Sequence, residues 1–172
     1  MLKLILNKKY NPLFSSDARY FIVTGGRGSG KSFAVTVFLT LLTMTKGIRI
    51  LFTRYTMTSA HLSIIPEFLE KIGLLGFDEV FSINKSEVLN TSNNSDILFR
   101  GIRTSAGNQT ASLKSLQGIS TWVLDEAEEL VDENIFDTID LSIREKNIHN
   151  RVVLILNPVT KEHWIYKRFF EE

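Results

Sequence analysis

The stretch of sequence that decides the fold is YFIVTGGRGSGKS, residues 20–32. An apolar run typical of a buried strand leads into the pattern G-x-x-x-x-G-K-[ST] at 25–32, and an apolar run typical of a helix follows. Glycines let successive backbone N–H groups turn toward phosphate oxygens, and the N-terminus of the following helix adds positive charge. We therefore predict a phosphate-binding loop, in which Lys31 contacts the β- and γ-phosphates and Ser32 holds Mg²⁺. The predicted nucleotide-binding residues are Gly25, Gly26, Arg27, Gly28, Ser29, Gly30, Lys31 and Ser32. A glycine-rich turn that matches by chance would not explain the strand and the helix on either side.

Length and composition limit the classes of protein to which the chain can belong. With 172 residues and 44% hydrophobic content, residues 1–172 are expected to form a single domain with a real core. The 20 Lys and Arg residues balance 19 Asp and Glu residues, so any contact with nucleic acid must be local or lie outside this chain. The absence of cysteine excludes disulfides, thiol catalysis and zinc–thiolate sites. No apolar run is long enough to span a membrane and the N-terminus lacks the layout of a signal peptide, so we expect a soluble cytosolic domain.

Apolar periodicity and turn residues predict the order of the elements. We expect one right-handed crossover unit, made of the strand, loop and helix at 19–45 and the strand that follows them. Pro66 marks a kink or a break in the second helix, the strands around 92–95 should form a hairpin at the edge of the sheet, and 104–110 should be a mobile loop. This alternation indicates an α/β fold with a mostly parallel central sheet flanked by helices. The expected strands are 2–6, 19–24, 48–53, 80–83, 87–91, 96–102, 121–124 and 151–156, and the expected helices are 32–45, 57–72, 132–144 and 163–170.

A second motif, TWVLDE at 121–126, has the Walker B pattern, an apolar strand that delivers an Asp at its carboxyl end. We expect Asp125 to bind Mg²⁺ together with Ser32, and Glu126 to polarise the attacking water. An Asp-Glu pair can also begin a solvated helix, but the phosphate loop upstream makes that the weaker interpretation. The adjacent Glu favours a P-loop NTPase of the ASCE type, which uses a catalytic Glu. A GTPase is disfavoured as well, because the guanine-reading sequence Asn-Lys-x-Asp is missing. The segment NKSE at 84–87 lacks its final Asp.

Two further residues are candidates for the catalytic site. Asn157 ends a strand expected beside the strand of the phosphate loop, so it can contact the γ-phosphate or the attacking water; the alternative is an ordinary Asn-Pro turn. Arg27, inside the loop, can stabilise transition-state charge or contact a neighbouring subunit; the alternative is a solvated loop residue. Other arginines could act in trans, but each is more readily explained as a surface residue: Arg54, Arg100, Arg103 and Arg144. The three histidines lack metal-ligand spacing and indicate no metal besides Mg²⁺: His61, His149 and His163.

With these residues, the chain resembles the N-terminal ATPase domain of phage terminase large subunits, the motors that package double-stranded DNA into empty capsids. The resemblance rests on the strand and arginine-containing loop at 19–32, the Walker B segment at 122–130, a Lys-Ser segment at 113–118, and LNP at 156–158 with the helix after it. It implies that residues 10–14 pack near the adenine. It also implies a role for each site residue: Lys31 and Arg27 contact the phosphates, Asp125 binds the metal, Glu126 is catalytic, and Asn157 couples hydrolysis to movement.

The resemblance implies partners as well. Members of this family work as rings on a portal, with a small terminase subunit that selects DNA, and carry a C-terminal nuclease domain of RNase H type. We therefore expect ATP and Mg²⁺ as cofactors, and double-stranded DNA, the portal protein, the small terminase subunit and further copies of the chain as partners, with no membrane. We expect the protein in the host-cell cytoplasm, outside the virion. Because the chain ends at Glu172 and has no nuclease carboxylate cluster, we expect no DNA cleavage by it.

The leading interpretation is an ATP-hydrolysing motor domain that powers translocation of double-stranded DNA into a procapsid. A helicase-like protein or a nucleotide kinase is disfavoured, because the sequence has neither a helicase motif series nor an acceptor-nucleotide lid. A nucleotide-gated binding module that does not turn ATP over is the third possibility. The intact pair of Asp125 and Glu126 argues against it.

Overall fold

The centre of the fold is an eight-stranded sheet with the order β1-β8-β7-β2-β5-β4-β3, and β6 pairs with β5. The computed structural model describes residues 4–57, 60–104, 107–108 and 110–171. Neighbours from β1 to β5 in this order run parallel, whereas β4 and β3 are antiparallel additions at one side. The strands are β1 (Tyr20–Thr24), β2 (Arg49–Thr56), β3 (Phe81–Ile83), β4 (Glu87–Asn90), β5 (Asp96–Thr104), β6 (Gly107–Asn108), β7 (Thr121–Asp125) and β8 (Arg151–Leu156).

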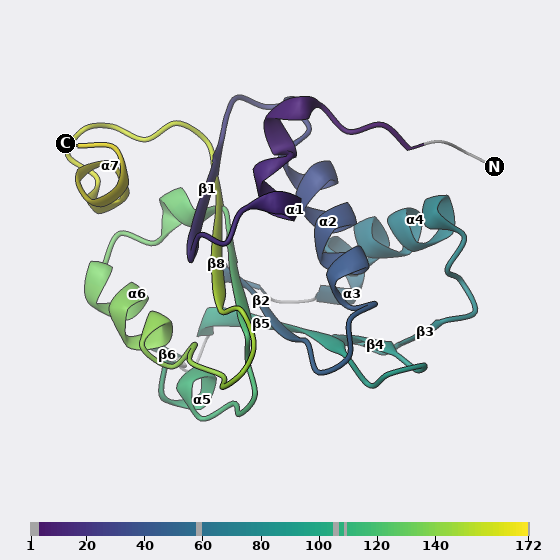
Figure 1. Ribbon diagram of the computed structural model, residues 1–172. Coiled ribbons are helices and arrows are strands. Elements are labelled where there is room, and N and C mark those ends of the chain that lie inside the picture. Colours follow the sequence, from purple (N-terminus) through teal and green to yellow (C-terminus); the bar gives the residue numbers. More distant parts are fainter. Residues whose placement is uncertain (1–3, 58–59, 105–106, 109, 172) are drawn as a thin grey trace.

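Helices cover both faces of the sheet, with α1 to α4 on one face and α5 to α7 on the other (Figure 1). In the described part of the chain, none of them combines the length and the apolar character that crossing a bilayer requires. The α-helices are α1 (Pro12–Ser15), α2 (Lys31–Leu42), α3 (Ala60–Ser63), α4 (Ile65–Leu75), α5 (Thr110–Lys114), α6 (Glu133–Asp140) and α7 (Trp164–Phe169), and the 3-10 turns are η1 (Lys8–Tyr10) and η2 (Ala127–Glu129).

The sheet separates two hydrophobic cores. Because successive side chains of a strand point to opposite faces, β8 contributes Val153 and Ile155 to the core under α2 and α4 and its other apolar residues to the core under α6 and α7. Helix α2 is buried over 34–40 because it packs against α1, α4 and the sheet. These layers confirm the predicted α/β fold with a mostly parallel sheet.

The topology brings distant parts of the sequence together at one edge of the sheet. Strands β1 and β2 are joined through α2, yet β8 and β7 lie between them. The carboxyl ends of β1, β8, β7 and β2 therefore meet at the same edge, because these four strands are parallel. Asn157 follows β8, the direct neighbour of β1, as the sequence predicted.

The N-terminal segment differs from the prediction. Residues 4–6 form no strand, and η1 and α1 follow them. The Asn7 side chain accepts a hydrogen bond from the N–H of Lys9 at 3.1 Å, and Pro12 lies in the first turn of α1, so both residues favour helical starts. Residues 2–3 of the predicted strand lie outside the described residues.

Two helices end earlier than predicted, and a third is divided. Helix α2 ends at Leu42, where the hydroxyl groups of Thr40 and Thr43 donate to backbone carbonyls of the preceding turn. Helix α6 ends at Asp140. The predicted helix 57–72 is divided at Ile64 into α3 and α4, with Pro66 in the first turn of α4, which confirms the predicted break. Its positions 58–59 lie outside the described residues.

The predicted hairpin of β4 and β5 is present, but it does not lie at the edge of the sheet. Strand β5 pairs with β2 in parallel, and β3 is the edge strand beyond β4. The reason is the apolar run at 97–99, which is buried on both faces and suits a central strand.

The predicted loop at 104–110 is also partly wrong, because β5 extends to Thr104, residues 107–108 pair with it as β6, and α5 begins at Thr110. Residues 105–106 and 109 lie outside the described part.

Candidate functional site

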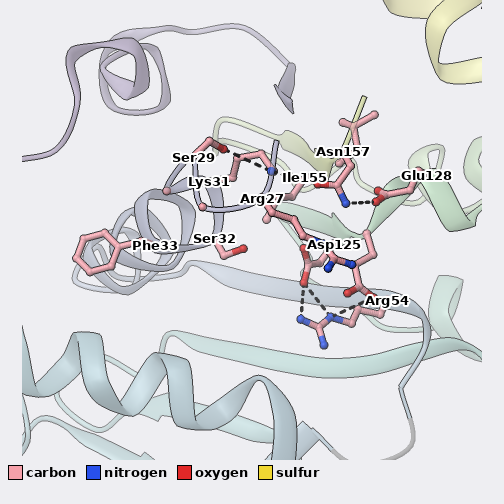
Figure 2. A pocket seen from close by; sticks show the side chains of 14 residues that line it. Arg27, Ser29, Lys31, Ser32, Phe33, Arg54, Asp125, Glu128, Ile155 and Asn157 are labelled. Carbon is pink, nitrogen blue, oxygen red and sulfur yellow. Dashed lines mark hydrogen bonds and ion pairs between the residues drawn. The ribbon is translucent and has the colours of Figure 1, made fainter. Parts of the chain in front are cut away.

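A cavity of about 400 Å³ opens at the carboxyl ends of the parallel strands, between the loop before α2 and the ends of β2, β7 and β8 (Figure 2). It is lined by Arg27, Gly28, Ser29, Gly30, Lys31, Ser32, Phe33, Arg54, Asp125, Glu126, Glu128, Ile155, Leu156 and Asn157. Every predicted catalytic and metal-binding residue is among them. Gly25 and Gly26 belong to the same loop but do not line the cavity, and their carbonyl groups accept hydrogen bonds from Lys31.

The loop has the backbone shape that its glycines predict. Gly28 and Gly30 have φ angles of +74° and +81°, in the left-handed region that glycine adopts without strain. Gly30 is the N-cap residue of α2, and no side chain caps the helix there. The N–H groups of the first turn of α2 are thus left to an external acceptor, as an anion-binding loop requires.

Lys31 lies across the inside of the loop. Its Nζ donates to the carbonyl oxygens of Gly25 and of Gly26, the latter at 3.0 Å, and lies 3.5 Å from Ser29 Oγ and from Asn157 Oδ1. The ammonium group is therefore held at the cavity wall, between the phosphate loop and the end of β8. The loop is anchored from behind as well, because the Tyr10 hydroxyl donates to Ser29 O at 2.8 Å. The packing of residues 10–14 near an adenine stays a prediction.

Asp125 ends β7 and is almost fully buried, at 4% exposure. Arg54, at the same level of the neighbouring strand β2, contacts a single oxygen of this carboxylate: Nε donates to Oδ2 at 2.8 Å and Nη2 lies 2.7 Å from it. Burial alone would lower the pKa of Arg54, but the charge of Asp125 and the hydrogen bond to it outweigh burial and raise that pKa. Because the contacts of Arg54 use Oδ2, Oδ1 is left for a metal ion or its water.

Glu126 follows Asp125 in a left-handed conformation, with a φ angle of +53°, which is uncommon for a residue other than glycine and often marks a functional site. Its side chain is 47% exposed, and its Oε2 lies 3.9 Å from Arg54 Nε. Burial raises the pKa of Glu126, and the charges of Asp125, Glu129 and Glu128 raise it further, while Arg54 opposes the shift. A carboxylate with a raised pKa at the mouth of the cavity suits proton acceptance from water.

Asn157 connects the loop to the segment after β7. Its Nδ2 donates to Glu128 Oε1 at 2.7 Å, while its Oδ1 faces Lys31 (Figure 2). Arg27 extends from the loop into the same cavity, and its side chain is exposed. The structure thus brings the predicted residues Arg27, Lys31 and Asn157 to one site.

Two charged residues that line the cavity were missed from the sequence. Arg54 was interpreted as a surface arginine, which is wrong because it is largely buried and paired with Asp125. A signal existed, since Arg54 directly follows the strand predicted at 48–53, and ligands collect where parallel strands end. Glu128 was not singled out within the acidic run, which gives no sign of which carboxylate turns inward. The other arginines considered lie away from the cavity: Arg100, Arg103 and Arg144.

The residues present fit a Mg²⁺ ion shared with a nucleotide. Among the described residues, no group of three or more His, Asp or Glu side chains could hold a metal by itself. Mg²⁺ in nucleotide sites takes only one or two protein oxygens and completes its shell with phosphates and water. Ser32 and Asp125 line the same cavity and offer a hydroxyl and the carboxylate oxygen that Arg54 does not contact for that purpose.

Comparison with known proteins gives relatives of one kind. The chain is 24% identical to the large terminase subunit of Bacillus phage SPP1, in an alignment 189 positions long, gaps included, that covers 98% of this chain and 43% of that protein. Its fold is similar to a large terminase from a thermophilic bacteriophage, with a TM-score of 0.76 at 10% identity over 98% of this chain and 43% of that one. Structures of that terminase with ADP and with ATP-gamma-S are similar as well. The N-terminal domain of the DNA packaging ATPase from bacteriophage phi29 matches with a TM-score of 0.68 at 16% identity, over 96% of this chain and 86% of that one.

These likenesses confirm the predicted fold, an α/β domain with a mostly parallel central sheet flanked by helices. The chain spans less than half the length of the SPP1 relative. The family model described as phage terminase large subunit matches residues 17–172, a range that holds the phosphate loop, the Walker B strand and Asn157. The chain belongs to the phage terminase large-subunit family.

Proposed function

We propose that this chain is the ATP-hydrolysing domain of a motor that packages double-stranded DNA into a phage procapsid. The observation that carries the proposal is that Lys31 and the adjacent pair Asp125 and Glu126, from two segments far apart in the sequence, line one cavity. Membership of the terminase family supports it, and so do the nucleotide complexes of a structurally similar terminase.

In the proposed reaction, the glycine loop and Lys31 bind the β- and γ-phosphates, and Glu126 accepts a proton from the attacking water. Bound Mg²⁺ would neutralise charge on the phosphates, with Ser32 and Asp125 as its protein ligands. Arg54 holds Asp125 in place through Oδ2. Its guanidinium also lies close to Glu126, so it favours the ionised form of the base.

Arg27 and Asn157 complete the proposed catalytic group. Arg27 extends a guanidinium from the loop into the cavity, where it can stabilise charge that develops on the γ-phosphate. Asn157 stands between Lys31 and Glu128. Loss of the γ-phosphate changes the partners of Lys31, and Asn157 passes this change to β8 and the segment after it. The same proposal makes Asn157 the link between hydrolysis and movement.

The proposed partners follow from the family. We propose that copies of the chain act as a ring on a portal, with double-stranded DNA and a small terminase subunit as further partners. The similarity to the phi29 genome packaging motor assembly, with a TM-score of 0.68 at 17% identity, supports an oligomeric motor. The host-cell cytoplasm as its location and its absence from the virion stay predictions.

The experiment that tests the function compares two substitutions. Lys31→Ala is expected to abolish binding of a fluorescent ATP analogue, and turnover with it, because the phosphates lose their ammonium contact. Glu126→Gln is expected to keep binding and to lose about 10² to 10⁴-fold in turnover, the contribution of a general base. Lys46→Ala is the matched control, since Lys46 is exposed and does not line the cavity.

Three results of these experiments would change the assignment. Unchanged hydrolysis of radiolabelled ATP in Glu126→Gln would contradict the catalytic assignment. A wild-type chain that binds ATP and shows no multiple turnovers would instead support a binding module. Transfer of phosphate from ATP to a nucleoside monophosphate would make the chain a nucleotide kinase.

A further inference from the structure

Glu128 lies at the wall of the nucleotide cavity, in the turn η2 that follows the Walker B strand. Glu126 follows β7 in a left-handed conformation, and η2, which comes next, contacts β8. The first carboxylate oxygen, Oε1, accepts a hydrogen bond of 2.7 Å from Asn157 Nδ2. A short hydrogen bond to an ionised acceptor is among the stronger kinds in proteins.

The surroundings of Asn157 admit one orientation of its amide. The Glu128 carboxylate accepts hydrogen bonds, and the Lys31 ammonium group only donates them. The amide must therefore turn its NH₂ group to Glu128 and its oxygen to Lys31, at 2.7 Å and 3.5 Å respectively. Glu128 thus decides which atom of Asn157 faces Lys31 and the phosphate loop.

The second carboxylate oxygen of Glu128 points to a role beyond packing. Oε2 is buried and has no hydrogen-bond partner among the described residues. An unpaired buried polar atom costs about 1 to 3 kcal/mol, so this placement of the Glu128 carboxylate lowers stability. Such atoms are rare in folded proteins and call for a functional or local explanation. The position of Glu128 on the cavity wall supplies that explanation.

The backbone of Glu128 is tied to the last helix. His163 caps α7 by accepting a hydrogen bond from the Ile165 N–H at its Nδ1, so its Nε2 carries the hydrogen and donates to Glu128 O at 3.1 Å. Trp164 Nε1 donates to Leu130 O at 2.6 Å. The segment after β7 is therefore bonded to Asn157 on one side and to α7 on the other.

We propose that Glu128 is a positioning residue of this site: its carboxylate fixes the amide of Asn157 so that Oδ1 faces Lys31, and its backbone carbonyl connects this arrangement to α7. The inference rests on the proposed ATP hydrolysis, because it assigns Glu128 to that reaction through Asn157. Glu128 itself does not have to touch the nucleotide.

The first test is a double-mutant cycle on steady-state ATP hydrolysis by the whole chain. Glu128→Ala is expected to lower kcat about 10- to 100-fold, as misplacement of a catalytic group does, with KM for ATP nearly unchanged. Glu128→Gln should keep more activity than Glu128→Ala, because its amide oxygen still accepts from Asn157. In an Asn157→Ala background, Glu128→Ala should have almost no further effect, since the two residues act as one unit. Fold changes that multiply would overturn the proposal, because Glu128 would then act independently.

Glu129 provides the matched control. It carries the same charge in the same turn, but its side chain is exposed and does not line the cavity. The charge of Glu129 helps to raise the pKa of Glu126, so kcat is compared at a pH at which Glu126 is fully ionised, where Glu129→Ala and Glu129→Gln are expected to leave it unchanged. Wild-type kcat in both Glu128 variants would also overturn the proposal. If Glu128→Ala does not fold, as judged by thermal unfolding, the cycle is run with Glu128→Gln, which preserves the size of the side chain.

The second test does not depend on turnover and so separates this inference from the proposed function. The side-chain NH₂ group of Asn157 gives a pair of signals in ¹⁵N NMR spectra, which are assigned by their loss in Asn157→Ala. Glu128→Ala is expected to shift this pair and to speed its exchange with water, whereas Glu129→Ala should do neither. Unchanged Asn157 signals would overturn the positioning role even in a chain that hydrolyses ATP. A shifted pair in a chain without turnover would leave Glu128 in place and refute the hydrolysis.

Discussion

Strand β2 carries an arginine near each end, and each pairs with an aspartate of a neighbouring strand. At the amino end, Arg49 Nε lies 3.1 Å from Asp96 Oδ2, and at the carboxyl end Arg54 Nη2 lies 2.7 Å from Asp125 Oδ2. The two aspartate side chains are almost equally buried, with 7% and 6% exposure. The chemistry of the two ion pairs is therefore nearly the same, and what differs is the region around them.

The ion pair at the amino end of β2 joins neighbouring segments of the fold. Arg49 uses Nε for both oxygens of Asp96 and Nη1 for the carbonyl of Gln117, so it ties β2 to β5 and to the segment before β7. Burial raises the pKa of Asp96, although Arg49 opposes the shift. The carboxyl-end pair instead borders the cavity and leaves Asp125 Oδ1 available. One pair stabilises the fold, while the other positions a ligand of the proposed metal.

The largest difference between the ends should appear when each aspartate is changed to asparagine. Asp125→Asn is expected to lower ATP turnover by about 10²-fold or more, because a charged partner of the transition state is lost. Asp96→Asn should keep turnover per folded molecule and lower the free energy of unfolding. Steady-state hydrolysis and urea unfolding of both variants measure the two effects. Equal losses of turnover would remove the distinction between the two ends.

The arginines offer a sharper form of the same comparison. Arg49→Ala and Arg54→Ala each leave a buried carboxylate without its cation, so each should cost about 2 kcal/mol of stability. Mg²⁺ with an ATP analogue should restore most of the loss in Arg54→Ala, because the metal replaces the lost charge beside Asp125. It should leave the deficit of Arg49→Ala unchanged. Thermal unfolding of both variants and the wild type, with and without Mg²⁺ and the analogue, measures the recovery of stability. Equal recovery in Arg49→Ala and Arg54→Ala would contradict the prediction.

The middle of β2 should respond differently from both ends. The Thr53 hydroxyl donates to Val123 O and accepts from Trp122 Nε1, each at 2.9 Å. Thr53→Val keeps the shape and leaves the buried indole N–H unpaired, at a cost of about 1 to 2 kcal/mol. Thr56→Val, at the exposed end of the strand, is the control and should change stability little. A Thr53→Val protein as stable as the wild type would show that this hydrogen bond contributes nothing net.

The smallest expected effect is on the pH dependence of hydrolysis. Glu126 must be ionised to accept a proton, so turnover should fall as the pH drops through its pKa, which burial and neighbouring carboxylates hold above the ordinary value. Arg54 opposes this shift, so the acidic limb of the pH–kcat profile should move to higher pH in Arg54→Ala. In Arg49→Ala it should stay in place. If the acidic limb of the profile does not move in Arg54→Ala, Arg54 does not influence the ionisation of Glu126.

The sequence predicted the parts of the site that follow from general rules of parallel sheets. The glycine pattern predicted the loop and Lys31, and an apolar strand ending in acidic residues predicted Asp125 and Glu126. These predictions required only that ligands collect at the carboxyl ends of parallel strands. Asn157 was predicted in the same way, from the end of a strand placed beside β1.

The parts that were missed depend on register and on local turns. Arg54 belongs to the site because β2 and β7 pair with Arg54 opposite Asp125, and a single sequence does not give that register. Glu128 turns inward because Glu126 adopts a left-handed conformation, which is uncommon for glutamate. The hairpin was predicted at the edge of the sheet, but the apolar run in β5 makes that strand a central one.

The strand order has a consequence for the synthesis of the protein. Strand β8 is the last strand along the chain, yet it lies between β1 and β7. A nascent chain on the ribosome can form the loop and α2 early, but it cannot place Asn157 beside Lys31 until β8 has been made and inserted. Pairings between residues so far apart in sequence form slowly. The complete nucleotide site should therefore appear late in synthesis, and ATP should not bind a ribosome-bound chain with full affinity before residue 157 has emerged.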